Sequence, residues 1–190
     1  MGADRRQLRG IVLAEDRRTE RFIRHLLDVC GFDKRKFRFH TAPGQGSGEA
    51  WVRVQYPGEV KLLRAKVHQR LCLVAICDGD ALGVEARKAQ LDEALRQADL
   101  QTRAATERIA TPVPTWAIEN WLLDLLGEPN INEAKKPSTE AGPTWKQLFE
   151  RAYGADEKGA LTEAANRWDT ANPRLPSLEN GRVEFERIDQ

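Results

Sequence analysis

The hydrophobic pattern of the first two thirds of the chain predicts strands that alternate with helices. Short apolar or alternating runs end at polar residues, whereas the segments between them place apolar side chains on one helical face. The predicted strands are 10–16, 36–42, 71–77 and 106–113. The predicted helices are 18–30, 59–70, 83–99 and 115–127. This order predicts an α/β fold with a mainly parallel sheet flanked by helices.

The pattern changes after residue 127. Pro, Asn, Lys and Glu are frequent just beyond this point, which predicts a loop, and two short helical stretches follow at 144–153 and 157–169. The remaining residues read as irregular. We therefore expect a main domain over 1–127 and, over 128–190, an extension of loop and short helices packed on it.

Composition narrows the class of protein. The 190 residues are 41% apolar and 31% charged with a net charge of +1, which is typical of a globular protein and gives no overall bias toward a polyanion. The three cysteines form no CxxC pair, and the three histidines show no metal-site spacing. No apolar run has membrane-spanning length, and the first residues lack a signal-peptide core. We expect a cytoplasmic protein with no membrane association.

Candidate chemistry lies where the apolar run "LCLVAIC" ends in acid. Asp78 and Asp80 follow this predicted strand, and Glu15 lies at the end of the first one. Ligands of open parallel sheets bind beyond the carboxyl ends of the strands, so neighbouring strands would bring these three carboxylates together. Their mutual repulsion favours a cation, and Mg²⁺ or Mn²⁺ prefers such hard oxygen ligands. A metal held in this way is suited to phosphodiester chemistry.

Two other interpretations use the same acids. Asp-Gly-Asp is good turn chemistry, and Asp80 would also serve as a cap for the following helix. A response-regulator receiver also has an acidic pair after its first strand and a phosphate-accepting Asp after a later one. Against the receiver, Asp78 comes late in the chain and no convincing Thr/Ser and Lys switch pair follows.

The motifs resemble those of the Toprim domain of topoisomerases, bacterial primases and OLD-type nucleases over about residues 10–125. Glu15 matches the strand-final Glu, and "DGDALG" matches DxDxxG through Asp78, Asp80 and Gly83. "AEDRRTERFIRHLL" and the Ile-Glu-x-Trp segment within 111–123 are similar to small Toprim-like proteins. Asp16 stands where many Toprim domains have Gly, which could alter the loop or add an acid.

The resemblance implies roles for individual residues. Asp78 and Asp80 would bind Mg²⁺, and Glu15 would bind metal or act as general base. Glu119 would complete a second metal site, although an exposed helix position or an ion pair with an arginine explains it equally well. Arg17 and Arg18, close to Glu15, would contact the phosphates of a DNA or RNA substrate.

The resulting hypothesis is a metal-dependent nuclease. Small Toprim-like proteins resemble the nuclease partner of a separate ATPase in bacterial anti-phage systems, and this chain has no Walker motif of its own. The alternative from another class is a non-catalytic Toprim-like subunit that binds or regulates a partner. Further copies of the chain itself are also expected partners. The glycine loop at 44–48 reads mainly as a flexible connection.

Overall fold

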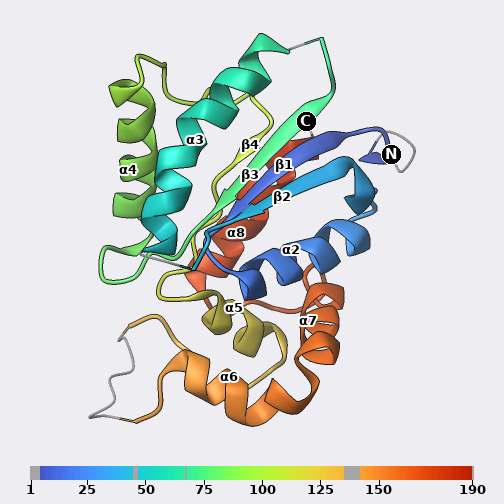
Figure 1. The fold of residues 1–190 in the computed structure, drawn as a ribbon. Helices are drawn as coiled ribbons and strands as arrows, with labels where there is room; N and C mark the ends of the chain where they lie inside the picture. Colours follow the sequence, from blue (N-terminus) through green and yellow to red (C-terminus); the bar gives the residue numbers. More distant parts are fainter. Residues whose placement is uncertain (1–4, 45–46, 67, 135–141, 190) are drawn as a thin grey trace.

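The computed structural model describes residues 5–44, 47–66, 68–134 and 142–189, and it shows an α/β fold. Four parallel strands form one sheet in the order β2-β1-β3-β4 (Figure 1). The strands are β1 (Arg9–Ala14), β2 (Phe37–Thr41), β3 (Leu71–Ile76) and β4 (Ile109–Ala110). The predicted fold class is therefore confirmed. The fourth strand is much shorter than the predicted 106–113.

Helices cover both faces of the sheet and its carboxyl end (Figure 1). The α-helices are α2 (Arg17–Val29), α3 (Gly48–Ala65), α4 (Gly83–Gln97), α5 (Ile118–Leu125), α6 (Trp145–Tyr153), α7 (Glu157–Asn166) and α8 (Pro176–Glu186). Among the described residues, short 3₁₀ helices occupy Lys34–Lys36, Gly154–Asp156 and Arg187–Asp189. Among the described stretches of chain, no helix is both long enough and apolar enough to cross a membrane.

Alternate side chains of the central strands point into two separate cores, as the pleat of a strand requires. On the face covered by α3 and α4, Leu13 and Leu73 pack against Val52, Tyr56 and Leu91. The larger core lies on the opposite face, between the sheet and helices that include α2, α5 and α8. Its largest fully buried side chains include Phe22, Trp121 and Phe149. Burial on both faces explains why β3 reads as an unbroken apolar run.

Helix α3 differs from its prediction. The sequence predicts a helix over 59–70, but the helix begins at Gly48 and ends at Ala65. Pro57 and Gly58 read as a break, yet Val52, Tyr56 and Val60 recur every four residues and are fully buried on one face. This apolar stripe outweighs the hydrogen bond lost at the proline. Residues 45–46 of the predicted glycine loop lie outside the described residues, and residue 48 is already helical.

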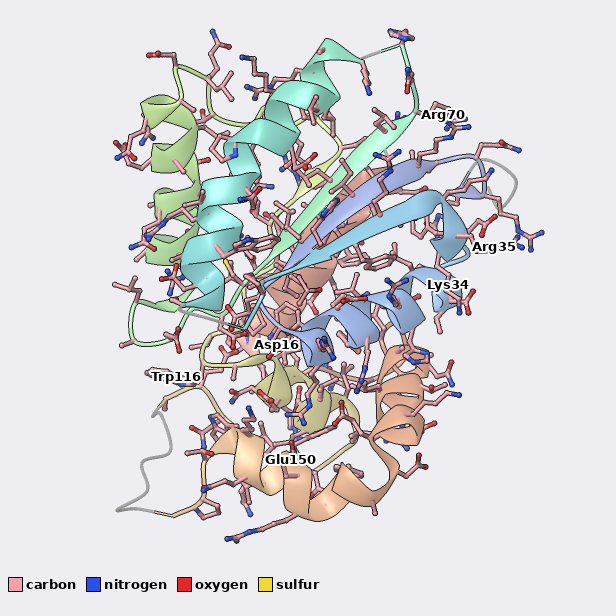
Figure 2. All side chains as sticks on the ribbon, viewed as in Figure 1. Asp16, Lys34, Arg35, Arg70, Trp116 and Glu150 are labelled. Carbon is pink, nitrogen blue, oxygen red and sulfur yellow. The ribbon has the colours of Figure 1, made fainter. Side chains whose placement is uncertain are left out.

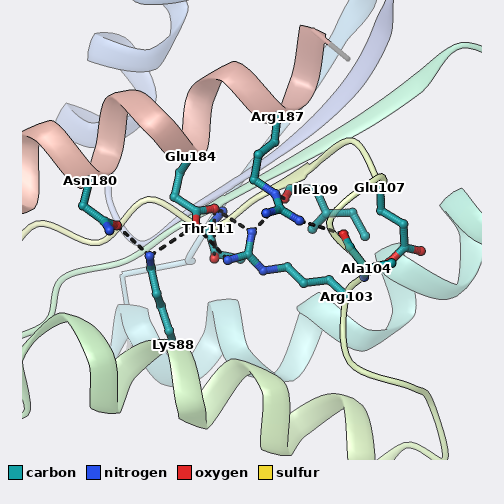
Figure 3. Close-up of polar contacts among 9 residues, drawn as sticks. All are labelled: Lys88, Arg103, Ala104, Glu107, Ile109, Thr111, Asn180, Glu184 and Arg187. Carbon is teal, nitrogen blue, oxygen red and sulfur yellow. Dashed lines mark hydrogen bonds and ion pairs between the residues drawn. The ribbon is translucent and has the colours of Figure 1, made fainter.

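The predicted irregular C-terminal end is also wrong, because it contains α8. Leu178 and Phe185 of this helix are buried in the larger core. Glu184 accepts hydrogen bonds from Arg103 and from the backbone N–H of Thr111, and it pairs with Lys88 (Figure 3). These contacts join α8 to α4 and to the segment around β4, so the C-terminal helix closes one face of the sheet.

Candidate functional site

Glu15 and Asp78 meet at the carboxyl end of the two central strands. Ala14 and Ile76 are paired in the register of β1 and β3, so the residues that follow leave the sheet side by side. The backbone N–H of Asp78 donates a 3.0 Å hydrogen bond to Oε2 of Glu15. The expected meeting of these two residues is confirmed by this contact, whereas their catalytic role stays a prediction.

Burial and mutual repulsion disfavour the charged forms of both acids. Asp78 is 8% exposed, and its pKa is raised well above its ordinary value, first by burial and then by the negative charges of Glu15 and Glu119. Burial also raises the pKa of Glu15, although its hydrogen bond from the Asp78 backbone works in the opposite direction. Two close carboxyls of this kind favour holding a proton unless a cation is bound.

The surroundings of Asp78 leave part of its carboxyl group without a partner. Oδ1 of Asp78 is buried and makes no hydrogen bond with any described residue. The same is true of Oγ1 of Thr19 and of both side-chain polar atoms of Asn120. Buried polar atoms are normally satisfied, so the unpaired oxygen of Asp78 indicates a place for water or a ligand.

Two glycines allow the backbone to close tightly around the pair. A Cβ atom on Gly48, in the first turn of α3, would lie 2.6 Å from the carbonyl oxygen of Glu15 and 2.7 Å from its Cβ. A Cβ atom on Gly79 would lie 2.7 Å from the carbonyl oxygen of Thr115. The N–H of Gly79 donates to the carbonyl oxygen of Pro114 at 2.7 Å. The loops that carry the two acids are thus fixed against α3 and against the segment before α5.

Asp80 is placed differently from Asp78. Its backbone is left-handed, with φ of 48°, and its side chain is 48% exposed. Oδ2 of Asp80 lies 3.7 Å from Nη2 of Arg87. Asp80 does not cap α4, which begins at Gly83 after Leu82 and has no side-chain cap among the described residues. The negative charge of Asp80 nevertheless raises the pKa of Glu15, so Asp80 belongs to the rim of the site.

Arg87 is a site residue that no sequence pattern singles out. It is 4% exposed, and its Nε donates to the backbone carbonyl of Asp78 at 2.9 Å. Its Nη1 donates to Glu49 at 2.6 Å and to Gln90 at 2.7 Å. Arg87 therefore holds the main chain at Asp78 while its hydrogen bonds leave the carboxyl group of that residue unpaired. In the sequence, Arg87 resembles any other arginine of a helix, so its contact with Asp78 could not be predicted.

Glu119 and Arg18 form an ion pair beside the acids. Nη1 of Arg18 lies 2.5 Å from Oε1 of Glu119, and the guanidinium also pairs with Glu150 and, at 3.1 Å, with Glu157. Its Cζ lies 4.9 Å from the centre of the Phe149 ring. The charge of Glu119 raises the pKa of Asp78, so this carboxylate acts on the site, although Arg18 partly neutralises it. The alternative of an arginine partner for Glu119 is thus confirmed, and this ion-pair cluster accounts for Arg18 without a substrate.

Arg17 and Asp16 lie at the start of α2. Asp16 caps this helix, since its Oδ1 accepts the backbone N–H of Thr19 at 2.7 Å. Figure 2 shows Asp16 at the end of the sheet opposite to Arg70. The side chain of Arg17 is exposed and makes no hydrogen bond or ion pair with any residue that the structure describes. Of the two predicted phosphate contacts, Arg17 is therefore the one with an available guanidinium.

The donor set at this edge can be compared with the needs of a divalent cation. Mg²⁺ commonly takes one or two carboxylates from a protein and completes its coordination with water and substrate phosphates. Glu15 and Asp78 offer two carboxyls, one with a buried oxygen that has no hydrogen-bond partner among the described residues. Within those residues, no three His, Cys, Asp or Glu side chains converge to hold an ion by themselves. Glu15 and Asp78 could therefore hold an ion only if water or another molecule supplied its remaining ligands.

Comparisons of the chain with protein-family models, with curated proteins and with solved structures find no match. The functional interpretation therefore depends on the residues at the carboxyl end of the sheet.

Proposed function

We propose that this protein is a divalent-metal-dependent nuclease that hydrolyses phosphodiester bonds of DNA or RNA. The observation that carries the proposal is the buried Asp78 beside Glu15, with a carboxyl oxygen that has no partner among the described residues. The motif resemblance to Toprim-like nucleases supports the same chemistry. A buried acid with a raised pKa at the end of a parallel sheet is also a common mark of a functional site.

In the proposed reaction, water attacks phosphorus and the bond from phosphorus to the leaving oxygen breaks. Mg²⁺ or Mn²⁺, when bound, would supply charge stabilisation and lower the pKa of the attacking water. Glu15 and Asp78 would hold the ion, and both must lose their protons to do so. Where Glu15 acts as the general base in place of a metal ligand, its carboxylate would take the water's proton. Arg17 would contact a neighbouring phosphate.

The remaining charged residues would position this pair. Arg87 holds the backbone carbonyl of Asp78, and Gly48 sets the distance between α3 and Glu15. Glu119 adds negative potential near Asp78, which would strengthen attraction of a cation, while its pairing with Arg18 keeps it from being a full ligand. Asp80, at the rim, would bind the ion through a water molecule, or directly when its contact with Arg87 is broken. Asp80 and Glu119 would thus be secondary ligands of the metal.

One observation favours a non-catalytic binding subunit as the second candidate. Glu119 is already paired with Arg18, and Asp80 lies toward Arg87, so of the four acids Glu15 and Asp78 are the two in hydrogen-bond contact. A Toprim-like subunit that had lost catalysis would keep the fold and work through a partner such as a separate ATPase. The two candidates differ in whether metal produces cleavage.

Cleavage assays would test the proposal directly. Supercoiled plasmid, single-stranded DNA and RNA are incubated with the protein in Mg²⁺, Mn²⁺ or EDTA. The wild type should cleave only with metal, and Asp78→Asn or Glu15→Gln should lower the rate by about 100-fold or more. Mn²⁺ should also raise the melting temperature of the wild type but not of either variant, because the ion binds only an intact pair.

Matched substitutions far from the site provide the control. Asp169→Asn and Glu163→Gln remove exposed carboxylates and should leave both cleavage and the Mn²⁺ shift unchanged. Cleavage that survives in EDTA, or that both site variants retain, would contradict the proposal. Metal binding without cleavage of any substrate would favour the non-catalytic subunit.

A further inference from the structure

A cationic groove of about 350 Å³ lies on the sheet face that α3 only partly covers. Its charged walls include Arg9 of β1, Arg38 of β2, Lys36 and, at the end of α3, Lys66. We call this feature the β2 groove. The chain as a whole carries a net charge of +1, so the accumulation of positive charge here is local.

The sheet topology explains why the groove is open. β2 is an edge strand, whereas α3 packs on β1 and β3. In the parallel register, Arg38 pairs with Ile11 and His40 pairs with Leu13, so these side chains share the face that carries α3. Arg38 and His40 are exposed there. The outer half of this face therefore presents polar side chains to solvent beside a buried apolar core.

The cations of the groove differ from most arginines in the molecule because no described acid pairs with them. Arg64 and Arg103, for example, each bind a carboxylate. Arg9, Arg38 and Lys66 form no side-chain hydrogen bond or ion pair with any described residue. The fourth cation is Lys36. Among the described residues, its Nζ donates hydrogen bonds only to the carbonyl oxygen of Arg6 and to the side chain of Gln7. The row of positive charge is therefore available to a ligand.

One acid lies among the described residues that line the groove. Glu59 has a buried Oε2 with no hydrogen-bond partner in the described structure, so this oxygen can accept a hydrogen bond from a ligand. The floor is apolar and includes Ile11, Leu63 and Leu71. A groove with cations at its rim, an apolar floor and an unused acceptor suits a ligand that has anionic groups, flat apolar faces and N–H or O–H donors.

We propose that the β2 groove binds a single-stranded stretch of nucleic acid and guides it toward Glu15. Phosphates would contact Arg9, Arg38 and Lys66, and base faces would lie on the apolar floor, which a duplex could not reach with its bases stacked. From Arg9 to Glu15 the sheet spans about 20 Å, and a strand that follows the open edge strand β2 would cover this distance with several nucleotides. This inference rests on the proposed nuclease function for what happens at the far end of the groove, but not for binding itself.

The spread of cations favours a polymer over a small phosphorylated molecule. Arg9 begins β1, Arg38 lies beside Ile11 on the neighbouring strand β2, and Lys66 follows the end of α3, so the cations come from three separate elements. A mononucleotide carries its phosphates at one end and would leave part of this row unused. A strand with one phosphate per nucleotide presents separate anionic groups to the cations of all three elements.

Binding without cleavage is the decisive measurement. A fluorescein-labelled single-stranded 12-mer is titrated with protein in EDTA, and fluorescence anisotropy gives the dissociation constant over a range of salt concentrations. The variant is Arg9→Gln/Arg38→Gln, and the matched control is Lys146→Gln/Arg151→Gln, which removes two exposed cations of α6. All four side chains are exposed, so circular dichroism and melting temperature should match the wild type.

The groove variant should bind about tenfold more weakly. Its plot of the logarithm of the association constant against the logarithm of salt concentration should be shallower by about 1.4 in slope, as expected for two lost phosphate contacts to a single strand. The control should bind as the wild type does. Equal weakening in both double variants, an unchanged affinity in the groove variant, or competition by AMP at the same concentration of nucleotide would overturn the proposal. If a duplex competes as well as the single strand, the proposed contacts between base faces and the groove floor are wrong.

The outcomes also separate this proposal from the nuclease. Salt-dependent binding through Arg9 and Arg38 without cleavage in Mg²⁺ or Mn²⁺ would support the groove and reject the enzyme. Metal-dependent cleavage with affinity unchanged in the groove variant would support the enzyme and reject the groove.

Discussion

Glu184 and Asp78 are both buried acids, with 6% and 8% exposure, but their surroundings are opposite. Glu184 accepts two hydrogen bonds from Arg103, at 2.6 and 2.8 Å, and lies 3.2 Å from Nζ of Lys88 (Figure 3). These hydrogen bonds and charges overcome burial and lower its pKa to about 2. The carboxyl group of Asp78 lies beside another acid, Glu15, and burial there raises its pKa.

The difference shows how the two regions use a buried charge. Where a carboxylate only joins elements, as at Glu184, the fold surrounds it with cations and N–H donors. At Asp78 the buried Arg87 donates instead to the backbone carbonyl and to Glu49. A fold that can satisfy one buried acid so fully, yet leaves another unsatisfied, gives up stability at the second place, which is typical of functional sites.

The largest effect should come from Glu184→Gln. Loss of this carboxylate leaves Arg103 and Lys88 partly buried without their counter-charge, and breaking a buried ion pair in this way lowers the free energy of unfolding by about 3–5 kcal/mol. Urea denaturation at pH 7 would measure it. Glu163→Gln, which breaks an exposed ion pair with Arg167, should change stability by less than about 1 kcal/mol. A loss of similar size in the two variants would mean that the Glu184 cluster contributes no more than a surface pair.

The same carboxylate should give the protein a marked acid dependence. Because the folded state lowers the pKa of Glu184 from 4.5 to about 2, its contribution is fully present above pH 4.5 and is lost as the pH falls toward 2. The contribution amounts to about 3 kcal/mol. The difference in unfolding free energy between wild type and Glu184→Gln should therefore shrink as the pH falls from 6 to 3. A difference that stays constant over this range would show that Glu184 is not held ionised by its partners.

Gly48→Ala should lower the free energy of unfolding by less than Glu184→Gln does, and it should also disturb the site. The new Cβ would meet the backbone of Glu15 at 2.6 Å, so α3 or Glu15 must shift, and overpacking of this kind destabilises by about 1–3 kcal/mol. Metal-dependent cleavage should fall with it, because Glu15 moves relative to Asp78.

Gly58→Ala is the matched control in the same helix. Residue 58 is exposed, and a Cβ atom added there would have no described atom within 4 Å. Because alanine is the better helix former, this variant should gain about 0.5–1 kcal/mol. Thermal denaturation of both variants would test the pair. A Gly48→Ala protein as stable and active as Gly58→Ala would contradict the tight packing of α3 on Glu15.

A smaller change than those of Glu184→Gln and Gly48→Ala, and of opposite sign, is expected from Asp78→Asn. The amide keeps the shape of the side chain and removes a charge that burial and Glu15 disfavour, so stability without divalent ions should rise by about 0.5–2 kcal/mol. Urea denaturation at pH 8 in EDTA would detect this. Glu119→Gln should instead lower stability, because Arg18 loses a partner. A loss in both variants would mean that Asp78 also has stabilising partners, and the contrast with Glu184 would not hold.

Much of the fold is predictable because its signals are local. The apolar run 71–77 and the β-branched run 10–16 have few alternatives to strands, and parallel strands place their ends together, which is why the sequence predicts that Glu15 and Asp78 meet. The predictions for α3 and α8 fail for one shared physical reason. Pro57 in one helix, and Asn180 and Gly181 in the other, are poor helix residues, and burial against the sheet outweighs their local preference.

The partners of the charged side chains are less predictable. Arg18 and Arg87 lie in helices where any arginine can face solvent. Arg18 contacts Glu150, which is 132 positions away in the sequence, and Arg87 contacts Glu49, which is 38 positions away. No periodicity in the sequence encodes such pairings. Asp78 and Arg17 are available at the site because, among the described residues, the charged side chains around them pair with other groups.

The dependence of the sheet on α8 has a consequence for how the chain matures. Leu178 and Phe185 fill the core against strands made more than sixty residues earlier, and Glu184 neutralises Arg103 beside β4. During synthesis, β1, β2 and β3 can emerge and pair with α2 while the apolar surface that α8 covers stays exposed and Arg103 lacks its counter-charge. A nascent chain that stalls before α8 would present this apolar surface to chaperones and proteases, so the larger core is completed only after α8 has left the ribosome.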